Sequence, residues 1–405
     1  MFFNLLKVMS SGAAAQGVNF LCVLLISTQF ADSEIALFSK VIALTAITIV
    51  CMDFGCNQLI VSRSNKGVDR YVLIIKLSAI VSSLVLFALF WDALASLYNI
   101  PLDILPYFLF YVITTSLSNS IAYSLQGKGD MRFFLIVFYG RVITHFSILF
   151  LFLVFDASSQ PYMDWLIIGC IVNLAFVLVF GFWKKQKISL ERHDGLLNSS
   201  LKKSMLYFLS ALAVVLMLRV DAIILGGISD EWLAEFFKVK AIALGISLVS
   251  TSFSHMFMTK IKQYTINGWP GYMREVCKAF LMFLPVSIIM LIMAPTVYSN
   301  LYGDISTSAN YIMLILICAY STGVITNPIN ALLLRAEKAS ILFKMNIIQL
   351  IIIYGLSSLL AAYSPVYVAM AIFSAHVFSL VFTLKYVRSH NVQIFRKIKA
   401  SFEVN

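Results

Sequence analysis

The chain has 405 residues, of which 60% are hydrophobic and 12% are charged, and its formal net charge is +11. With a mean hydropathy of +0.91, this composition excludes an ordinary soluble domain and predicts a polytopic membrane protein. The positive charge does not indicate a nucleic-acid partner, because no basic patch stands apart from a predicted membrane span.

Apolar stretches along the chain predict an all-α protein with about twelve transmembrane helices. Every connection on the predicted outer side lacks Lys and Arg, whereas the inner connections are basic, so both termini are expected in the cytoplasm. The first stretch is predicted to be a retained span and not a cleaved signal, because its small residues 13–15 precede the apolar part. The approximate spans are 8–29, 35–60, 71–91, 104–126, 133–155, 164–183, 204–227, 234–257, 277–299, 308–331, 339–362 and 365–387.

The longest inner connection, residues 184–203, is strongly basic and divides the chain into two sets of six predicted helices. We therefore expect two six-helix lobes, 1–183 and 204–387, around a central cavity. The tail 388–405 has apolar residues at helical spacing among basic ones, which predicts a cytoplasmic amphipathic helix with its apolar face in the inner headgroup region.

A short internal repeat relates the two halves at an offset of 198 residues. The segment DSEIALFSKVIA (32–43) matches DEWLAEFFKVKA (230–241) at six of twelve positions, including Asp32/Asp230 and Lys40/Lys238. Because both copies are expected to cross the membrane from outside to inside, the pattern indicates a parallel duplication.

The usual signatures of catalysis and of cofactor binding are absent from the sequence. The six cysteines fall in or beside predicted spans, so no disulfide framework is implied. No metal-ligand spacing, phosphate-binding loop or catalytic set of serine, histidine and acid is present. We therefore predict a protein that is not an enzyme and that has no cofactor and no metal site.

Basic residues deep inside predicted spans mark the candidate site. Arg141 lies about 12 Å into its span, where an arginine costs about 2.5–3.5 kcal/mol even on a lenient scale. His145 follows one helical turn later on the same face. We expect this pair to line a cavity, the alternative being a structural pairing with a neighbouring helix.

Further charges occur in the seventh and eighth spans. Asp221 matches Lys238 and Lys240 in depth, so an ion pair with one of these lysines is predicted, which would leave Arg219 and the other lysine for a ligand. Lys40, the repeat partner of Lys238, is expected to share the lining role. The predicted substrate-binding set is thus Arg141, Arg219, Lys40, Lys238 and Lys240, with Asp221 and His145 as a coupling pair or structural ion pair.

Three charges near inner helix ends receive a simpler interpretation. Lys76 and Lys344 are expected to extend their side chains to the headgroups. Asp53 is expected to cap its helix or to pair with Arg63 or Lys66. Pro285, Pro295 and Pro328 are expected to interrupt their helices.

The sequence resembles the O-antigen flippases (Wzx type) of the polysaccharide transport family, within the multidrug/oligosaccharidyl-lipid/polysaccharide exporter superfamily. The resemblance is spread over the chain and is carried by MDFGCNQLIVSR, LQGKGDMRFF, YFLSALAVVLMLRVDAIILGG and NLYG, in this order. It implies a two-lobed transporter with a cationic cavity, to which Arg141, Arg219 and Lys238 correspond, and an acidic position at Asp221.

The implied substrate is an oligosaccharide on undecaprenyl diphosphate, moved by alternating access from the inner to the outer leaflet of a bacterial cytoplasmic membrane. Membrane lipids are expected as partners, and the resemblance suggests the polysaccharide polymerase and chain-length machinery as others. The alternative is an exporter of organic cations of the same superfamily, whose cavity should present acids. A lipid II flippase would usually have two more spans, and a membrane-bound polymerase would carry a large, arginine-bearing outer loop.

Overall fold

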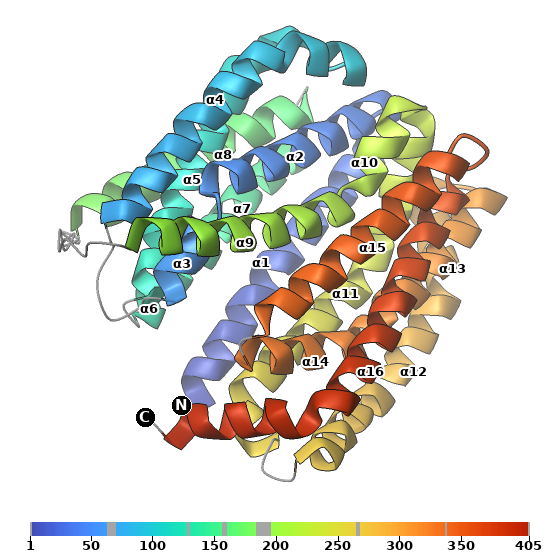
Figure 1. Cartoon of the computed structure of the whole chain (residues 1–405). Coiled ribbons are helices and arrows are strands. Elements are labelled where there is room, and N and C mark those ends of the chain that lie inside the picture. The colour runs from blue at the N-terminus through green and yellow to red at the C-terminus, as the bar shows by residue number, and fades with distance from the viewer. Residues whose placement is uncertain are drawn as a thin grey trace. The chain divides into compact units, whose positions relative to one another are not determined.

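A computed structural model describes residues 2–62, 70–127, 130–155, 160–183, 196–264, 268–336 and 338–403. Within these residues the chain consists of helices and short connections, and it contains no strand (Figure 1). The prediction of an all-α polytopic membrane fold is therefore confirmed.

Ten of the described helical segments are long and apolar enough to cross a membrane. They correspond to ten of the twelve predicted spans. The other two spans fall on α1 (Phe2–Gln29), whose apolar part Gly17–Gln29 is short, and on α11 (Asp230–Tyr264), which is long but less apolar. The number twelve thus stays a prediction.

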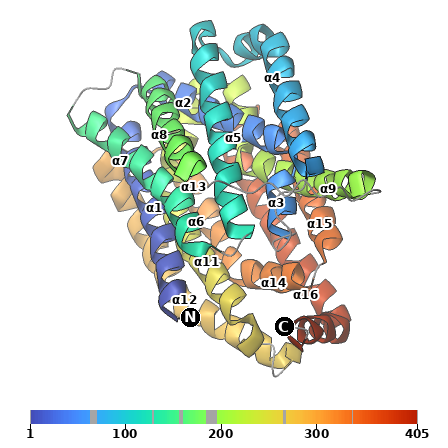
Figure 2. The same ribbon diagram turned by 90° about the vertical axis from the view of Figure 1, so that its left-hand side faces the viewer.

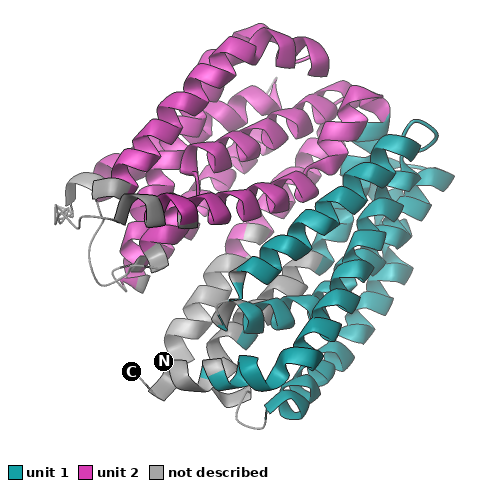
Figure 3. Ribbon diagram, in the orientation of Figure 1, with its two compact units in different colours: residues 1–13, 232–405 teal, residues 14–231 magenta. Residues whose placement is uncertain are grey.

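The chain forms two compact units, shown in different colours in Figure 3. Unit 2 comprises residues 14–231, and unit 1 comprises residues 1–13 and 232–405. Residues 196–231, which sequence analysis assigned mostly to the second lobe, are grouped here with the first six predicted helices. The division into two six-helix lobes at the basic linker 184–203 stays a prediction, and residues 184–195 of this linker lie outside the described residues.

Unit 2 is built around helix α2, which packs against four other long helices. Figure 2 shows α5 beside α8 and the short α3, in agreement with their contacts. Because α2 is surrounded by protein, ten of its side chains are buried, a lysine among them. The helices concerned are α2 (Asp32–Asp53), α3 (Cys56–Ser62), α4 (Arg70–Tyr98), α5 (Leu105–Gly127), α8 (Pro161–Trp183) and α9 (Leu196–Leu218).

Several predicted spans of unit 2 are broken helices. After α2, Phe54 and Gly55 adopt left-handed backbone angles, φ 45° and 71°, before α3 begins. The fifth span divides into α6 (Met131–Leu135), the π-helical turn η2 (Ile136–Gly140) and α7 (Arg141–Val154). The seventh is broken at Arg219, between α9 and α10 (Val220–Ile224), and ends in the 3₁₀ turn η3 (Leu225–Gly227).

The prolines of unit 1 do not interrupt their helices as predicted. Helix α12 runs without interruption through Pro285 and Pro295, so these residues do not break it. The tenth span is broken at Thr322, well before Pro328, which lies inside α14. Unit 1 contains α12 (Gly268–Tyr302), α13 (Thr307–Ser321), α14 (Gly323–Arg335), α15 (Ala339–Leu360) and α16 (Val366–Glu403), with α16 in contact with the other four.

The predicted amphipathic tail is the last part of α16, beyond a kink at His390. Its residues Ile394 and Ile398 are fully buried in a hydrophobic cluster with Tyr272 of α12 and Leu332 of α14. The tail is helical, as predicted. The expectation that its apolar face lies among lipid headgroups is wrong for these two side chains, because the protein itself covers them.

Candidate functional site

Arg141 lies at the start of α7 inside unit 2, with 7% of its surface exposed. Its guanidinium donates hydrogen bonds to the carbonyl of Thr115 (3.4 Å), the hydroxyl of Ser118 and the amide oxygen of Asn119 (2.8 Å), all on α5. The π-helical turn η2 directly precedes Arg141, and π-helical insertions are frequent at functional sites. The described partners of this buried cation are all neutral.

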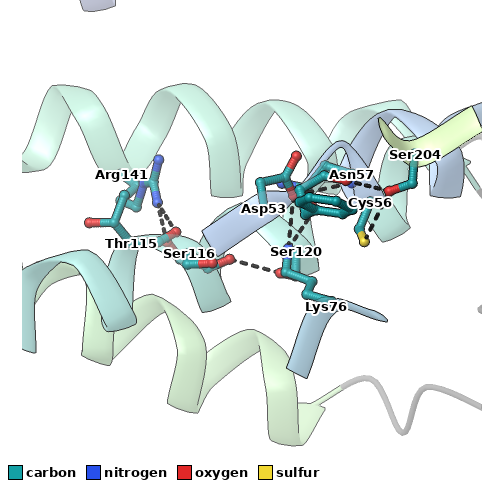
Figure 4. A network of polar contacts seen from close by, with 11 residues as sticks. Asp53, Cys56, Asn57, Lys76, Thr115, Ser116, Ser120, Arg141 and Ser204 are labelled. Atoms are coloured by element: carbon teal, nitrogen blue, oxygen red, sulfur yellow. Dashed lines mark hydrogen bonds and ion pairs between the residues drawn. The ribbon is translucent and has the colours of Figure 1, made fainter. Parts of the chain in front are cut away.

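A polar stretch of α5, Thr114 to Ser120, supplies these partners. The hydroxyl of Thr115 accepts a hydrogen bond from the Asn173 amide of α8 (2.8 Å), and Ser120 donates to the Ser116 carbonyl (2.7 Å). In Figure 4 this stretch lies between Arg141 and a second polar group around Asp53. Sequence analysis did not select α5, although the run TTSLSNS inside an apolar span was a visible signal.

His145 is held in a closely packed aromatic environment in the same unit. A ring nitrogen lies 2.9 Å from the Trp165 carbonyl, and the ring is 6.1 Å from that of Tyr111, centroid to centroid. A Cβ added at Gly169 would come within 2.8 Å of the imidazole, so no space is left on that side. Arg141 and His145 therefore both lie in the interior of one unit, and their predicted role in lining a substrate cavity stays a prediction.

The second polar group tests the interpretation of two charges near inner helix ends. Lys76 is buried, and its ammonium donates to Asp53 (3.1 Å) and Asn57 (2.7 Å). The expectation that Lys76 extends to the headgroups is wrong. Asp53 pairs with Lys76 on the neighbouring α4, and its carboxylate also accepts a hydrogen bond from the backbone N–H of Asn57 (3.2 Å), so it caps the start of α3. The other expected partners of Asp53, Arg63 and Lys66, lie outside the described residues.

Lys40 is the second buried lysine of unit 2, with 2% of its side chain exposed. Its ammonium forms an ion pair with Asp230 and donates to the Tyr98 carbonyl (2.9 Å). Asp230 is the repeat equivalent of Asp32, so a lysine of the first repeat copy contacts the acid of the second. The expected substrate-binding role of Lys40 stays a prediction, and the described geometry gives its charge a partner.

The repeat itself has a structural basis in packing. Asp32 begins α2 and Asp230 begins α11. The lysines of the two copies differ, because Lys238 is half-buried and lies 5.7 Å from the Tyr302 ring centroid, in cation–π contact. The matching apolar pairs are all buried in both copies, with at most 3% exposed: Ala36/Ala234, Phe38/Phe236, Val41/Val239 and Ala43/Ala241.

The remaining predicted site residues lie at or beyond the break in the seventh span. Arg219 occupies the position before α10 and is partly exposed, and Asp221 is buried in α10. Lys240 is partly exposed on α11. Asp221 belongs to unit 2 and Lys238 and Lys240 to unit 1, so the predicted ion pair stays a prediction.

The residues that the structure describes form neither a metal cluster nor a disulfide. No group of three or more His, Cys, Asp or Glu side chains among them is arranged to hold a metal ion. The six cysteines are all free.

This chain matches known proteins in its fold and not in its sequence. No protein-family model matches the chain, and no curated protein matches it in sequence. Among solved structures, it is similar to an inward-facing multidrug resistance MATE family transporter of the MOP superfamily (TM-score 0.67, 12% identity, 94% of this chain and 95% of the other).

Two further solved structures span nearly the whole chain. One is the MATE multidrug transporter DinF-BH (TM-score 0.63, 15% identity, 96% and 95% covered). The other is a MOP superfamily transporter from Pyrococcus furiosus, described by a reverse polarity of its binding pocket that suggests a different function (TM-score 0.61, 13% identity, 96% and 96% covered). The chain is thus a multi-pass membrane protein with the fold of MATE transporters of the MOP superfamily.

Proposed function

We propose that this protein is a transporter that moves an undecaprenyl-diphosphate-linked oligosaccharide, such as an O-antigen repeat unit, from the inner to the outer leaflet of a bacterial cytoplasmic membrane by alternating access. The observation that carries the proposal is Arg141, a buried cation whose described partners are neutral. A positive charge without a carboxylate beside it attracts anions, and low-dielectric surroundings strengthen this attraction.

The charges of unit 2 give the proposal further support. The partly buried acid Asp53 already contacts Lys76, and Asp230 contacts Lys40. A diphosphate needs positive charge, whereas a cationic drug needs an available carboxylate. The sequence resemblance to O-antigen flippases points to the same anionic, lipid-linked substrate.

Multidrug export is the second candidate, and the similarity in fold favours it more directly. Two of the similar structures are described as multidrug transporters. The Pyrococcus furiosus relative in fold is described as having a pocket of reverse polarity. The same fold is thus found with pockets of different polarity, so charge is the property by which the two candidates differ.

One experiment separates the candidates. The gene is expressed in cells that lack their own O-unit flippase and carry the polysaccharide gene cluster that belongs with this protein. Surface polysaccharide and the lipid-linked intermediate in the inner leaflet are both measured. Restored polysaccharide with cleared intermediate supports the flippase. Failure of rescue by an inserted protein, together with raised resistance to cationic dyes in cells lacking their drug exporters, would overturn it in favour of drug export.

The arginine is tested in the same cells. Arg141→Ala removes the buried positive charge that is proposed to attract the diphosphate. Truncating one partner of a buried charge pair costs about 2–5 kcal/mol, so we expect export to fall at least about tenfold while the protein still inserts. Arg388→Ala, which changes an exposed arginine of α16, is the matched control and should retain export. Normal export by Arg141→Ala would contradict the proposed role.

A further inference from the structure

An apolar pocket of about 260 Å³ lies within unit 2, between α2, α4 and the α9–α10 segment. Its walls include Leu44 and Ile47 of α2, Phe87 and Leu94 of α4, and Leu216 and Ile223 of the third segment. All six side chains are partly exposed. The pocket is therefore open at the surface of its unit, so a ligand can enter it without unfolding a helix.

Lys40 is the charged group in the pocket wall, and its charge is already balanced. Asp230 and the Tyr98 carbonyl hold the ammonium. An anionic group that entered the pocket would have to compete with the Asp230 carboxylate. The part of a ligand inside the pocket is therefore uncharged.

In the predicted orientation, the end of the pocket at Lys40 lies in the outer half of the membrane. Lys40 lies eight residues after Asp32, the first residue of α2, which is about 12 Å along the helix. Tyr98 is the last residue of α4. Both of these helix ends belong to the predicted outer side.

We propose that this pocket binds a segment of the hydrocarbon chain of a membrane amphiphile whose headgroup lies at the outer surface. A dry cavity of about 150 Å³ lined by Leu, Ile and Phe takes up benzene, so 260 Å³ accommodates a short stretch of a branched or linear chain. Water is a poor occupant, because it requires two to four polar partners. The site is independent of the proposed function and would serve a lipid whichever substrate is moved.

The surroundings of the pocket offer a hydrocarbon chain a continuous apolar path. On α4, next to Phe87 and Leu94, the side chains of Leu89, Phe90 and Leu97 are 73%, 57% and 64% exposed. These are large apolar groups facing away from the protein, as expected of a surface in contact with lipid. A chain lying against α4 can therefore bend into the pocket and stay in apolar surroundings.

Two sources could provide such a chain, the isoprenoid of a lipid-linked saccharide and the acyl chain of a phospholipid. The test uses the full chain in lipid nanodiscs containing either a diazirine-bearing polyprenyl diphosphate or a phospholipid with a diazirine on one acyl chain. After irradiation, labelled peptides are mapped by mass spectrometry. We expect labels on the pocket-lining parts of α2 and α4, from the polyprenyl probe alone if the substrate is the occupant and from both probes if any lipid is.

Variants that fill the pocket provide the control of specificity. Ala43→Phe and Ala222→Phe place a ring into it from different walls and should lower labelling about tenfold, whereas Ala88→Phe, on the exposed face of α4, should leave it within about twofold. Gel filtration and melting temperature show which variants are folded, and either filled variant suffices. Absence of label from the pocket segments with both probes, or undiminished label in a folded filled variant, would overturn the proposal. If the protein fails to rescue export but is labelled in the pocket, the proposed function is overturned and the lipid site is supported.

Discussion

Among the described residues of unit 2, three buried side chains are positively charged, and each is satisfied in a different way. Lys40 has a carboxylate and a backbone carbonyl, Lys76 has a carboxylate and an amide, and Arg141 has neutral groups only. A charge without such partners at membrane depth costs several kcal/mol. The two lysines thus have carboxylate partners within the fold, and we propose Arg141, whose described partners are neutral, as the contact for an anionic ligand.

The pair of Asp53 and Lys76 gives a test at the scale of residues. Asp53→Asn leaves the buried charge of Lys76 without its partner, and Lys76→Met leaves the partly buried charge of Asp53 without its partner. Breaking a fully buried pair typically costs about 3–5 kcal/mol, so we expect a loss of up to this size. The double variant leaves no charge, so we expect it to be less destabilised than either single variant. Unfolding of the four proteins in mixed micelles measures this coupling. Additive losses would show that the ion pair does not act as a unit.

At the scale of elements, the break between α2 and α3 determines how α9 packs. Gly55 has φ 71°, and a Cβ there would lie 2.3 Å from the Ser204 carbonyl oxygen and 2.8 Å from the Phe208 amide nitrogen. The backbone of α9 thus approaches the break so closely that only glycine fits. Ser204 adds a hydrogen bond from its hydroxyl to the Phe54 carbonyl. The motif MDFG consequently has a packing role.

Substitution of this glycine tests that role. Gly55→Ala forces a strained backbone, at about 1–3 kcal/mol, and displaces α9, so a lowered melting temperature is expected. Gly355→Ala in the middle of α15 meets nothing within 4 Å and should be neutral or stabilising by about 0.5–1 kcal/mol. Equal melting temperatures for Gly55→Ala and the unaltered protein would contradict the close approach.

The end of α16 is a second element whose role is testable. Ile394→Asp places a charge in the cluster that contains Tyr272 and Leu332, and it loses the burial of a large apolar side chain, about 1.5–3 kcal/mol. Val392→Asp, at a position that is 67% exposed, is the matched control. We expect proteolysis of the tail to accelerate only in the first variant. The same protease sensitivity in both would mean that the tail does not pack on its unit.

For the whole molecule, the proposed cargo makes a prediction about the driving force. Moving two phosphate charges outward along an inside-negative potential gains roughly 4–5 kcal/mol per 100 mV. In membrane vesicles, transport of the lipid-linked oligosaccharide should therefore slow when the voltage is collapsed at a fixed pH gradient. It should persist when the pH gradient is collapsed at a fixed voltage. The reverse pattern would indicate proton coupling, for which His145 and Asp221 are the candidate groups.

The sequence by itself determined the fold class, because the number of long apolar stretches and the exclusion of Lys and Arg from one side follow from the physics of the bilayer. It also located Arg141, since a charge in an apolar stretch is visible without a structure. Helix packing decided the rest. That Lys76 contacts Asp53, that Asp230 balances Lys40 and that α5 supplies the partners of Arg141 all depend on which helices are neighbours.

Contacts between helices that are far apart in the chain cannot be predicted from the periodicity of one sequence. For this reason, the burial of the tail could not be predicted from the sequence, and neither could the helical conformation at the prolines. The burial of Ile394 depends on helices that precede it by many residues. Helix α12 is continuous through Pro285 and Pro295, although proline in a helix interior normally kinks or breaks it. Local chemistry thus determined what the helices are, and tertiary contact decided which charges are available to a ligand, because a partner in space neutralises a charge regardless of its place in the sequence.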